Sequence, residues 1–346
     1  MDLKKRLGNL FILGFSGPEL VSGSRIEEDI SERNLGGVIL FDRNLHNPAL
    51  PGNITSPQQL RRLTAALRNC SSETLLIGVD QEGGLVQRLN LRNGFSATPS
   101  AAAMGSAAGG AAGTSAQAEQ TAQTLAAAGI NLNFAPVVDL NSNRKNPIIG
   151  RIGRSFAEEP ETVIEHAWAW ICAHKRQGVV SCLKHFPGHG SSAADSHLGF
   201  VDISASWQEN ELTPYRELIK RGAIEMVMAG HLFNRHIDPV YPAPLSHATI
   251  TGLLRQDLGF AGVVLTDDIQ MKGITDRYDL SEVLCRSFAA GIDMIVIGNN
   301  LAYAPAVLDA ALAAVLAGLR QGSVSEERLY SALDRVQKLK TSMKGR

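Results

Sequence analysis

The sequence has few cysteines and no excess of charge of either sign. Its four cysteines are far apart and none lies in a Cys-x-x-Cys pair: Cys70, Cys172, Cys182 and Cys285. This spacing excludes a zinc ribbon and a disulfide scaffold, so we expect free thiols in a reducing compartment. The formal net charge is −1 and no block of lysine or arginine stands out. Nothing therefore indicates a nucleic-acid partner or a membrane surface, and a small, neutral or weakly charged ligand fits better.

Long apolar runs are also missing, and no segment approaches the length of a membrane span. The N-terminal segment is the one candidate for a targeting sequence, because Lys4–Arg6 precede the apolar stretch Leu7–Phe15. Asn9 interrupts that stretch, and no clear small-residue cleavage site follows it. We expect a first β-strand here rather than a signal peptide.

What the sequence does contain is a regular alternation of short apolar runs and helical segments. The apolar runs are the expected strands: Leu10–Phe15, Gly37–Phe41, Leu75–Asp80, Leu132–Leu140, Val179–His185, Glu225–His231, Gly262–Asp268 and Met294–Gly298. Near-continuous apolar strands are typical of a parallel sheet that is covered on both faces. Their alternation with helices predicts an α/β fold, a single-domain (β/α)8 TIM-type barrel spanning residues 1–346.

The segments between the strands have helical composition and helix-ending glycines. Helices are expected over Pro57–Arg68, Ala116–Ala128, Thr162–Gln177, Glu211–Arg221, Leu280–Ala290, Ala304–Arg320 and Ser325–Lys340, with the last (325–340) packing on the outside of the barrel. Gly129, Gly178, Gly222 and Gly291 each follow a predicted helix, where a left-handed cap favours glycine. Ser100–Gly113 is rich in alanine and glycine, which is typical either of a flexible loop or of small residues that let the backbone pass close to another group. Of the two, we expect a mobile loop.

Polar residues end five consecutive predicted strands. They are Asp80, Asp139, Lys184 with His185, His231, and Asp267 with Asp268. In a barrel of this kind the reacting groups lie at the carboxyl ends of the strands. Aspartates that cap helices explain one or two such positions, whereas five in succession indicate a polar site.

Two neighbouring segments carry residues suited to proton transfer. In Lys184–Gly190, a stiff Pro/Gly turn directly after a strand holds one lysine and two histidines together. In Asp195-Ser-His197, the aspartate can accept a hydrogen bond from one imidazole nitrogen, which leaves the other nitrogen for proton transfer. By itself the second segment is typical of a solvated loop, but beside the first it indicates an acid/base pair.

The same region offers an alternative interpretation as a metal site. His185, His189, Asp195 and His197 are residue types that bind zinc or iron. However, Lys184 beside them would repel a cation, and the first strand lacks the His-x-His pair of metal-dependent barrel hydrolases. We therefore expect acid/base chemistry without a metal.

Several glycine-rich motifs occur in a defined order along the chain. They are Gly36–Asn44, Gly78–Gly84 with Val86–Arg88, Asn133–Asp139, Asn146–Gly150 with Gly153–Phe156, Lys184–Gly190, Asp195–His197 and Thr266–Gly273. Each motif is weakly specific alone. In this order, and with the Lys184–Gly190 segment among them, the chain resembles the N-acetylglucosaminidase branch of glycoside hydrolase family 3 over essentially its whole length.

The resemblance implies a role for each residue that matches the family pattern. It implies that Asp267 is the nucleophile and that His197, oriented by Asp195, is the general acid/base. The residues that would hold the sugar are Asp80, Arg88, Arg154, Lys184 and His185. Histidine replaces the usual carboxylic acid of retaining glycosidases, and its ordinary pKa of roughly 6.5 suits the task. No cofactor is implied, because side chains supply both chemical steps.

The chain departs from the family pattern at two places. Leu85 stands where the family commonly has arginine. The segment Gly150–Ser155 is slightly longer than usual, which leaves open whether Arg151 or Arg154 reaches the sugar. A further choice, between Asp267 and its neighbour Asp268, rests on the motif alone.

The resemblance implies retaining exo-hydrolysis of terminal β-linked N-acetylglucosamine. The expected setting is cytoplasmic recycling of peptidoglycan, with a small carbohydrate or muropeptide as substrate and a monomeric enzyme. One alternative is a phosphorylase on the same scaffold, because a histidine acid/base would not repel an incoming phosphate dianion. Others are a catalytically inactive sugar-binding barrel and a general β-glucosidase.

Overall fold

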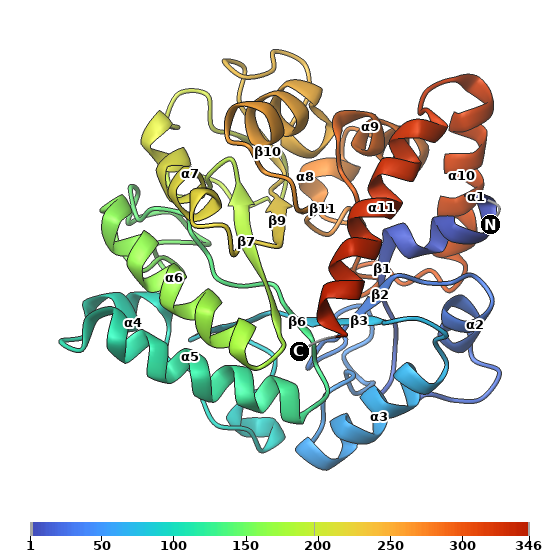
Figure 1. The fold of residues 1–346 in the computed structure, drawn as a ribbon, viewed down its shortest axis with the longest axis horizontal. Coiled ribbons are helices and arrows are strands. Elements are labelled where there is room, and N and C mark those ends of the chain that lie inside the picture. The colour runs from blue at the N-terminus through green and yellow to red at the C-terminus, as the bar shows by residue number, and fades with distance from the viewer. Residues whose placement is uncertain (1–2, 197, 345–346) are drawn as a thin grey trace.

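The computed structural model describes residues 3–196 and 198–344, and a ring of parallel strands runs through its centre (Figure 1). The strands of this ring are β1 (Phe11–Gly14), β2 (Gly37–Ile39), β3 (Leu76–Val79), β6 (Leu132–Asn133), β7 (Val180–Phe186), β9 (Met226–Ala229), β11 (Val263–Thr266) and β12 (Ile295–Ile297). Each pairs with its neighbour in chain order, and β12 pairs with β1. A parallel bridge between Leu265 and Met294 joins β11 to the β12 segment. The predicted (β/α)8 barrel is confirmed.

All eight predicted strands are present, although most are shorter than predicted. The N-terminal apolar segment forms β1, as expected. The largest difference is β6, which has two residues where the sequence predicts Leu132–Leu140. The chain stays beside β7 after β6, since Val138 N donates to Lys184 O at 2.9 Å. Pro136 has no N–H to donate, so the regular ladder is interrupted there.

Helices surround the ring (Figure 1). The α-helices are α1 (Leu3–Arg6), α2 (Arg25–Ser31), α3 (Pro57–Asn69), α4 (Ala101–Ser106), α5 (Gly110–Ala127), α6 (Pro160–Arg176), α7 (Thr213–Lys220), α8 (Lys272–Thr275), α9 (Leu280–Ala290), α10 (Val307–Gln321) and α11 (Glu326–Met343). All seven predicted helices are found, and the glycines predicted to end four of them have positive φ. Within residues 3–196 and 198–344, none of these helices combines the length and apolarity required to cross a bilayer.

Shorter elements lie in the connections. The 3₁₀ turns are η1 (Leu7–Leu10), η2 (Leu91–Asn93), η3 (Glu209–Leu212) and η4 (Ala243–Leu245), and η5 (Ala248–Asp257) is a π-helix that the sequence did not predict. Two small sheets pair β4 (Gln81–Gly83) with β5 (Val86–Gln87), and β8 (Val201–Asp202) with β10 (Leu232–Phe233).

The expectation of a mobile loop over Ser100–Gly113 is wrong, because this stretch forms α4 and the start of α5. The Ser100 side chain caps α4 by accepting a hydrogen bond from Ala103 N. Gly105 within α4 lies so close to the backbone oxygen of Phe156 that a Cβ there would collide with it. The small residues therefore allow a close helix–backbone contact rather than mobility.

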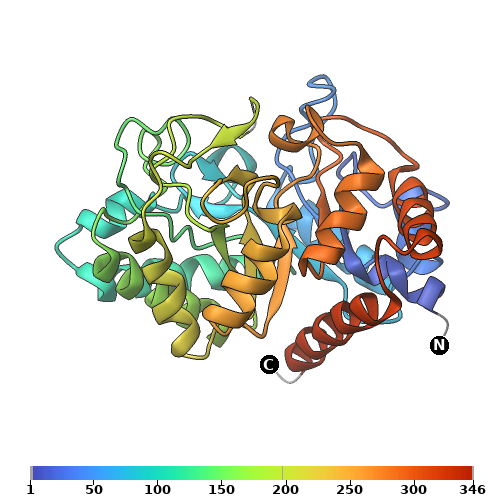
Figure 2. The ribbon, with the colours of Figure 1, turned by 90° about the horizontal axis from the view of Figure 1, so that it is seen from above.

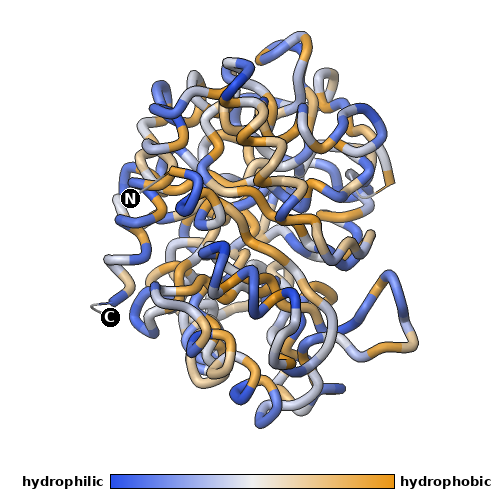
Figure 3. The backbone as a smooth tube through the Cα atoms, turned by 90° about the vertical axis from the view of Figure 1, so that its right-hand side faces the viewer, coloured by the Kyte–Doolittle hydropathy of each residue, from blue (hydrophilic) through white to orange (hydrophobic). Residues whose placement is uncertain are grey.

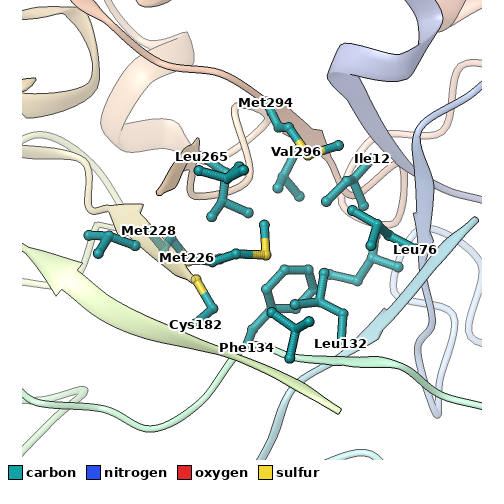
Figure 4. Packing of buried hydrophobic residues seen from close by; sticks show 14 of the residues in the cluster. Ile12, Leu76, Leu132, Phe134, Cys182, Met226, Met228, Leu265, Met294 and Val296 are labelled. Atoms are coloured by element: carbon teal, nitrogen blue, oxygen red, sulfur yellow. The ribbon is translucent and has the colours of Figure 1, made fainter. Parts of the chain in front are cut away.

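Apolar side chains fill the interior of the ring. Figure 4 shows Ile12, Leu76, Met226 and Leu265 converging on the ring of Phe134 from different strands. These side chains are fully buried. The most hydrophobic segments run through the middle of the molecule, as the tube in Figure 3 shows. The barrel is thus a packed core, and a ligand can enter only above its uppermost layer.

The helix α11 lies on the side of the barrel away from the loops that follow the strands (Figure 2). One buried carboxylate, Asp293 at the start of the β12 segment, holds it there. Asp293 accepts from Arg328 at 2.8 Å and from Arg335 at 3.2 Å, both on α11. It also contacts Arg255 of η5 at 2.5 Å and accepts from Val264 N at 3.0 Å. A helix packed outside the barrel was predicted, and this ion cluster is its attachment.

Replacing Asp293 with alanine should destabilise the protein by about 3–5 kcal/mol, because three arginines lose a buried counter-charge. Urea unfolding measures this loss. The control is Asp334→Ala, which breaks an exposed α11 ion pair with Lys338 at 2.7 Å. The control should change the free energy of unfolding little, since exposed pairs are screened by solvent. Equal losses in the two variants would contradict the role assigned to Asp293.

Candidate active site

A cavity of about 280 Å³ opens above the barrel core, at the carboxyl ends of the strands. Its polar wall includes Asp80, which follows β3, Arg88, which follows β5, and Asp267, which follows β11. Phe134 and Met228, from the uppermost layer of the core, also line it. Three of the residues predicted for the site therefore share one cavity with an apolar floor.

A network of buried charges stands beside this cavity. Lys184 Nζ lies 2.8 Å from Asp80 Oδ1 and 2.7 Å from Glu82 Oε1. The Arg154 guanidinium makes two hydrogen bonds of 2.7 Å to the Glu82 carboxylate. Arg88 Nη2 lies 3.5 Å from Asp80 Oδ2. Two carboxylates and three cations thus form one continuous network.

The charges in this network stabilise one another. Burial by itself would raise the pKa of Glu82, but the charges of Arg154 and Lys184 hold this pKa well below its ordinary value. Burial likewise opposes the charge of Lys184, yet Asp80 and Glu82 raise the pKa of that amine. Glu82 and Lys184 are therefore both ionised near neutral pH. Such groups donate and accept the charge-assisted hydrogen bonds that a sugar hydroxyl can replace or join.

Glu82 was missed by the sequence reasoning, although it lies within the Gly78–Gly84 motif. The signal was its position two residues after Asp80. A carboxylate that is buried beside a candidate site requires a cation as partner. Of the two arginines left open, Arg154 is buried in the network, whereas Arg151 is exposed. Leu85, at the position where the family commonly has arginine, is 73% exposed.

His185 lies between the network and a second buried carboxylate, Asp139. Its Nδ1 is 2.7 Å from Asp139 Oδ2, and its Nε2 is 3.2 Å from Arg154 Nη2. A guanidinium only donates hydrogen bonds, so Nε2 accepts and Nδ1 carries the proton toward Asp139. This arrangement fixes the tautomer and the orientation of the ring.

Side chains of other segments hold the backbone around the turn after β7 through hydrogen bonds. Asp139 Oδ1 accepts from the amides of His185 at 3.1 Å and His189 at 2.8 Å. Asn146 Nδ2 donates to the carbonyls of His189 at 2.7 Å and Gly190 at 3.2 Å. Burial lowers the pKa of His189 to about 4, so its ring is neutral at pH 7. The rings of His185, at the end of β7, and His189, in the turn, lie 5.8 Å apart between centroids, whereas the Lys184 amine contacts Asp80 and Glu82.

The two adjacent aspartates after β11 have different surroundings. Asp268 Oδ1 accepts from the amides of Gln270 at 3.0 Å and Gly298 at 2.9 Å. It thereby joins the β11 loop to the end of β12. Asp267 continues the strand direction, with its amide donating to Ala229 O at 3.0 Å, and its carboxylate accepts from Asp268 N at 2.8 Å. Both aspartates line the cavity, and Asp268 also holds the β11 loop against the end of β12.

The remaining predicted pair lies on the loop that follows the turn. Asp195 is half-buried, and the next residue, Ser196, is buried with its carbonyl accepting from Gly273 N at 2.9 Å. His197 lies outside the described residues. Gly273 belongs to α8, which begins directly after the cavity residue Met271. The loop is thus attached beside the cavity at Ser196.

Glu82→Gln should destabilise the protein by about 3–5 kcal/mol at pH 7, because Arg154 and Lys184 would share one fewer buried negative charge. The pKa of Glu82 is lowered in the folded state, so its contribution is present above the unfolded pKa and is lost in acid. The difference in the free energy of unfolding between wild type and variant should therefore become smaller as the pH falls below about 4.5.

Urea unfolding at several pH values measures this difference. Glu158→Gln is the control, since Glu158 forms only an exposed pair with Arg144 at 3.5 Å. A difference for Glu82→Gln that does not change with pH would contradict the ionised, paired state of Glu82.

Comparison with known proteins places this chain in a family. The chain matches the model of the glycosyl hydrolase family 3 N-terminal domain over residues 3–339. It is 38% identical over 303 residues to a beta-hexosaminidase of Tolumonas auensis, covering 85% of this chain and 86% of that protein. It is 33% identical over 338 residues to beta-hexosaminidase A of Pseudoalteromonas piscicida, covering 92% of this chain and 55% of that protein.

Solved structures agree. A family 3 beta-N-acetylglucosaminidase from Paenibacillus sp. superposes with a TM-score of 0.89 at 35% identity, covering 99% of this chain and 63% of that one. A beta-N-acetylhexosaminidase from Beutenbergia cavernae superposes with a TM-score of 0.85 at 27% identity, covering 100% of this chain and 99% of that one. The chain thus spans about half to two thirds of some relatives and nearly all of others. On this evidence the chain belongs to glycoside hydrolase family 3.

Proposed function

We propose that the protein is a retaining exo-β-N-acetylglucosaminidase that hydrolyses terminal β-linked N-acetylglucosamine. The observation that carries this proposal is the cavity in which Asp267 lies with Asp80 and Arg88 above an apolar floor. Paired polar groups on one wall and apolar side chains below suit a sugar ring, whose edge is polar and whose faces are apolar. The printed names of the relatives, beta-hexosaminidase and beta-N-acetylglucosaminidase, support the choice of sugar.

In the proposed reaction, the Asp267 carboxylate attacks the anomeric carbon of the sugar. His197 gives its proton to the leaving oxygen as the glycosidic bond breaks, and a glycosyl-enzyme ester forms. His197 then takes a proton from water, which attacks the same carbon and releases Asp267. Asp195 orients the imidazole throughout. Two displacements at one carbon retain its configuration.

The buried network is proposed to hold the sugar. Asp80, Arg88, Arg154, Lys184 and His185 would bind its hydroxyl groups. Because Lys184 and Arg154 are already fixed by Glu82, they lose little freedom when the sugar binds. Asp268 is proposed to act only through the loop that it holds.

We also propose the biological setting implied by the family resemblance. The natural substrate would be a peptidoglycan fragment or muropeptide, cleaved in the cytoplasm by a monomeric enzyme whose residues 1–346 form one catalytic domain. No metal or organic cofactor enters the proposed mechanism, since the carboxylate and the imidazole supply both steps.

Asp267→Ala should lower the release of chromophore from an aryl β-N-acetylglucosaminide by roughly 10³-fold or more, because the covalent intermediate cannot form. Asp268→Asn is the matched control. Asparagine keeps an oxygen that can accept from the Gln270 and Gly298 amides, so this variant should stay within about tenfold of wild type. Equal losses in the two variants would contradict the choice of nucleophile.

Adding phosphate to the same assay tests the rival activities. Turnover that is indifferent to phosphate supports hydrolysis, whereas turnover that rises with phosphate and yields a sugar 1-phosphate makes the protein a phosphorylase. Sugar bound without turnover would indicate an inactive binding barrel. Equal rates on the aryl β-glucoside would remove the preference for the 2-acetamido group.

Arg154→Lys should lower kcat/KM on the same substrate by roughly 10²-fold. Lysine keeps the charge but cannot make the two-pronged contact with Glu82 or the bond to His185. Arg151→Lys changes an exposed arginine and should have no effect. Steady-state kinetics on both variants decides this, and a larger loss in the Arg151 variant would reverse the assignment.

A further inference from the structure

Glu211 is a buried carboxylate behind the turn that follows β7, and the proposed mechanism does not use it. It is 1% exposed and belongs to η3, which leads into α7 outside the ring. Its Oε2 accepts from Gly190 N at 3.1 Å. It therefore contacts the protein backbone only seven residues before His197.

The fit between Glu211 and the turn is close. A Cβ added to Gly188, where φ is 121°, would lie 2.7 Å from Glu211 Cβ and 2.8 Å from its Oε2. A side chain at Gly188 would displace the carboxylate. Glycine here thus permits the carboxylate to reach the Gly190 amide.

Glu211 is one of two carboxylates that hold this turn. Asp139 binds the amides of His185 and His189 from the barrel side, and Glu211 binds the Gly190 amide from the helix side. Trp207 Nε1 adds a bond to the carbonyl of Pro187 at 3.0 Å. The segment that continues to Asp195 therefore leaves a turn whose peptide groups are held from two sides.

The titratable groups around Glu211 differ in charge at neutral pH. Burial opposes the charge of Asp139, but His185 and His189 hold its pKa below the ordinary value. Burial keeps His189 and Tyr215 neutral, by lowering the pKa of His189 to about 4 and raising that of Tyr215. Burial raises the pKa of Glu211 to about 7, and the charge of Asp139 adds to this. Glu211, with a pKa of about 7, therefore lies beside a charged Asp139 and a neutral His189 and Tyr215.

We propose that Glu211 is a positioning residue that holds the Gly190 amide, and with it the segment that continues to Asp195, more firmly when ionised than when protonated. An amide binds a carboxylate more strongly than it binds a neutral carboxylic acid. Its effect on catalysis rests on the proposed function, because it acts through the acid/base loop. Its effect on the turn does not.

The first test measures hydrogen exchange at the 187–196 segment of the intact protein between pH 5.5 and 8.5, corrected for the intrinsic rate. In openings that free the Gly190 amide but leave Glu211 buried, protection at Gly190 should rise roughly three- to tenfold as the pH passes about 7 in wild type. A fall in protection over this range, which is the result if the opening exposes Glu211 to water, would overturn the proposal. In Glu211→Gln, which keeps an acceptor but no titration, protection should stay constant. Glu209→Gln changes an exposed carboxylate on the same η3 turn and should behave as wild type.

The second test is the pH profile of kcat on the aryl β-N-acetylglucosaminide. Glu211→Gln should lower kcat roughly three- to tenfold above pH 7.5, leave KM within about twofold, and match wild type at pH 5.5. A variant whose profile and exchange both follow wild type would overturn the proposal. So would a parallel loss of kcat at every pH, which indicates only a structural role.

Thermal unfolding tests whether the variant folds and whether Glu211 titrates. A carboxylate whose pKa is raised in the folded state contributes stability in acid that is lost as the pH rises to about 7. The melting temperature of Glu211→Gln minus that of wild type should therefore increase from pH 5.5 to 8.5. A difference that does not change with pH would overturn the proposal. Wild type that shows pH-dependent exchange but no turnover would refute the proposed function and leave the role of Glu211 standing.

Discussion

The carboxylate of Glu82 lies between the ammonium of Lys184 and the guanidinium of Arg154, and three segments of the barrel meet at this contact. Burying any one of these charges alone would be strongly unfavourable, so each requires the others. The loop after β3, the strand β7 and the segment that carries Arg154 are thereby locked to one another. The hydrogen-bond donors and acceptors beside the cavity therefore have fixed positions before any ligand binds. Stabilisation of a transition state requires such preorganised groups.

A second buried carboxylate extends the same principle to the backbone. Asp139 fixes the tautomer of His185 and holds two amides of the turn after β7, while Asn146 holds its carbonyls. Because the peptide groups of the turn are satisfied by side chains, it need not belong to a helix or a sheet. The chain can therefore leave the barrel sharply, which places the loop with Asp195 beside α8 and near the cavity.

The opposite end of the barrel uses buried charge for a different purpose. Asp293 gathers arginines from α11 and η5, and no cavity residue takes part in that cluster as described. Because this end of the barrel serves stability, the loops at the other end can vary and carry function. Glu211 combines the two roles of buried charge: it belongs to an element outside the ring, and it supports a loop of the candidate site.

The sequence by itself determined the barrel, because apolar strands alternate with helices and polar residues end the strands on one side. It also predicted the site residues at those ends, among them Asp80, Lys184 and Asp267. Only the tertiary structure revealed Glu82 and Glu211 as partners, since nothing local tells whether a carboxylate is buried and what faces it. The same holds for α4, whose small residues are compatible with a mobile loop or with a close backbone contact, and only the backbone that packs against Gly105 decides between them. Local patterns decide which elements form, whereas charge pairing and close packing depend on segments far apart in the chain.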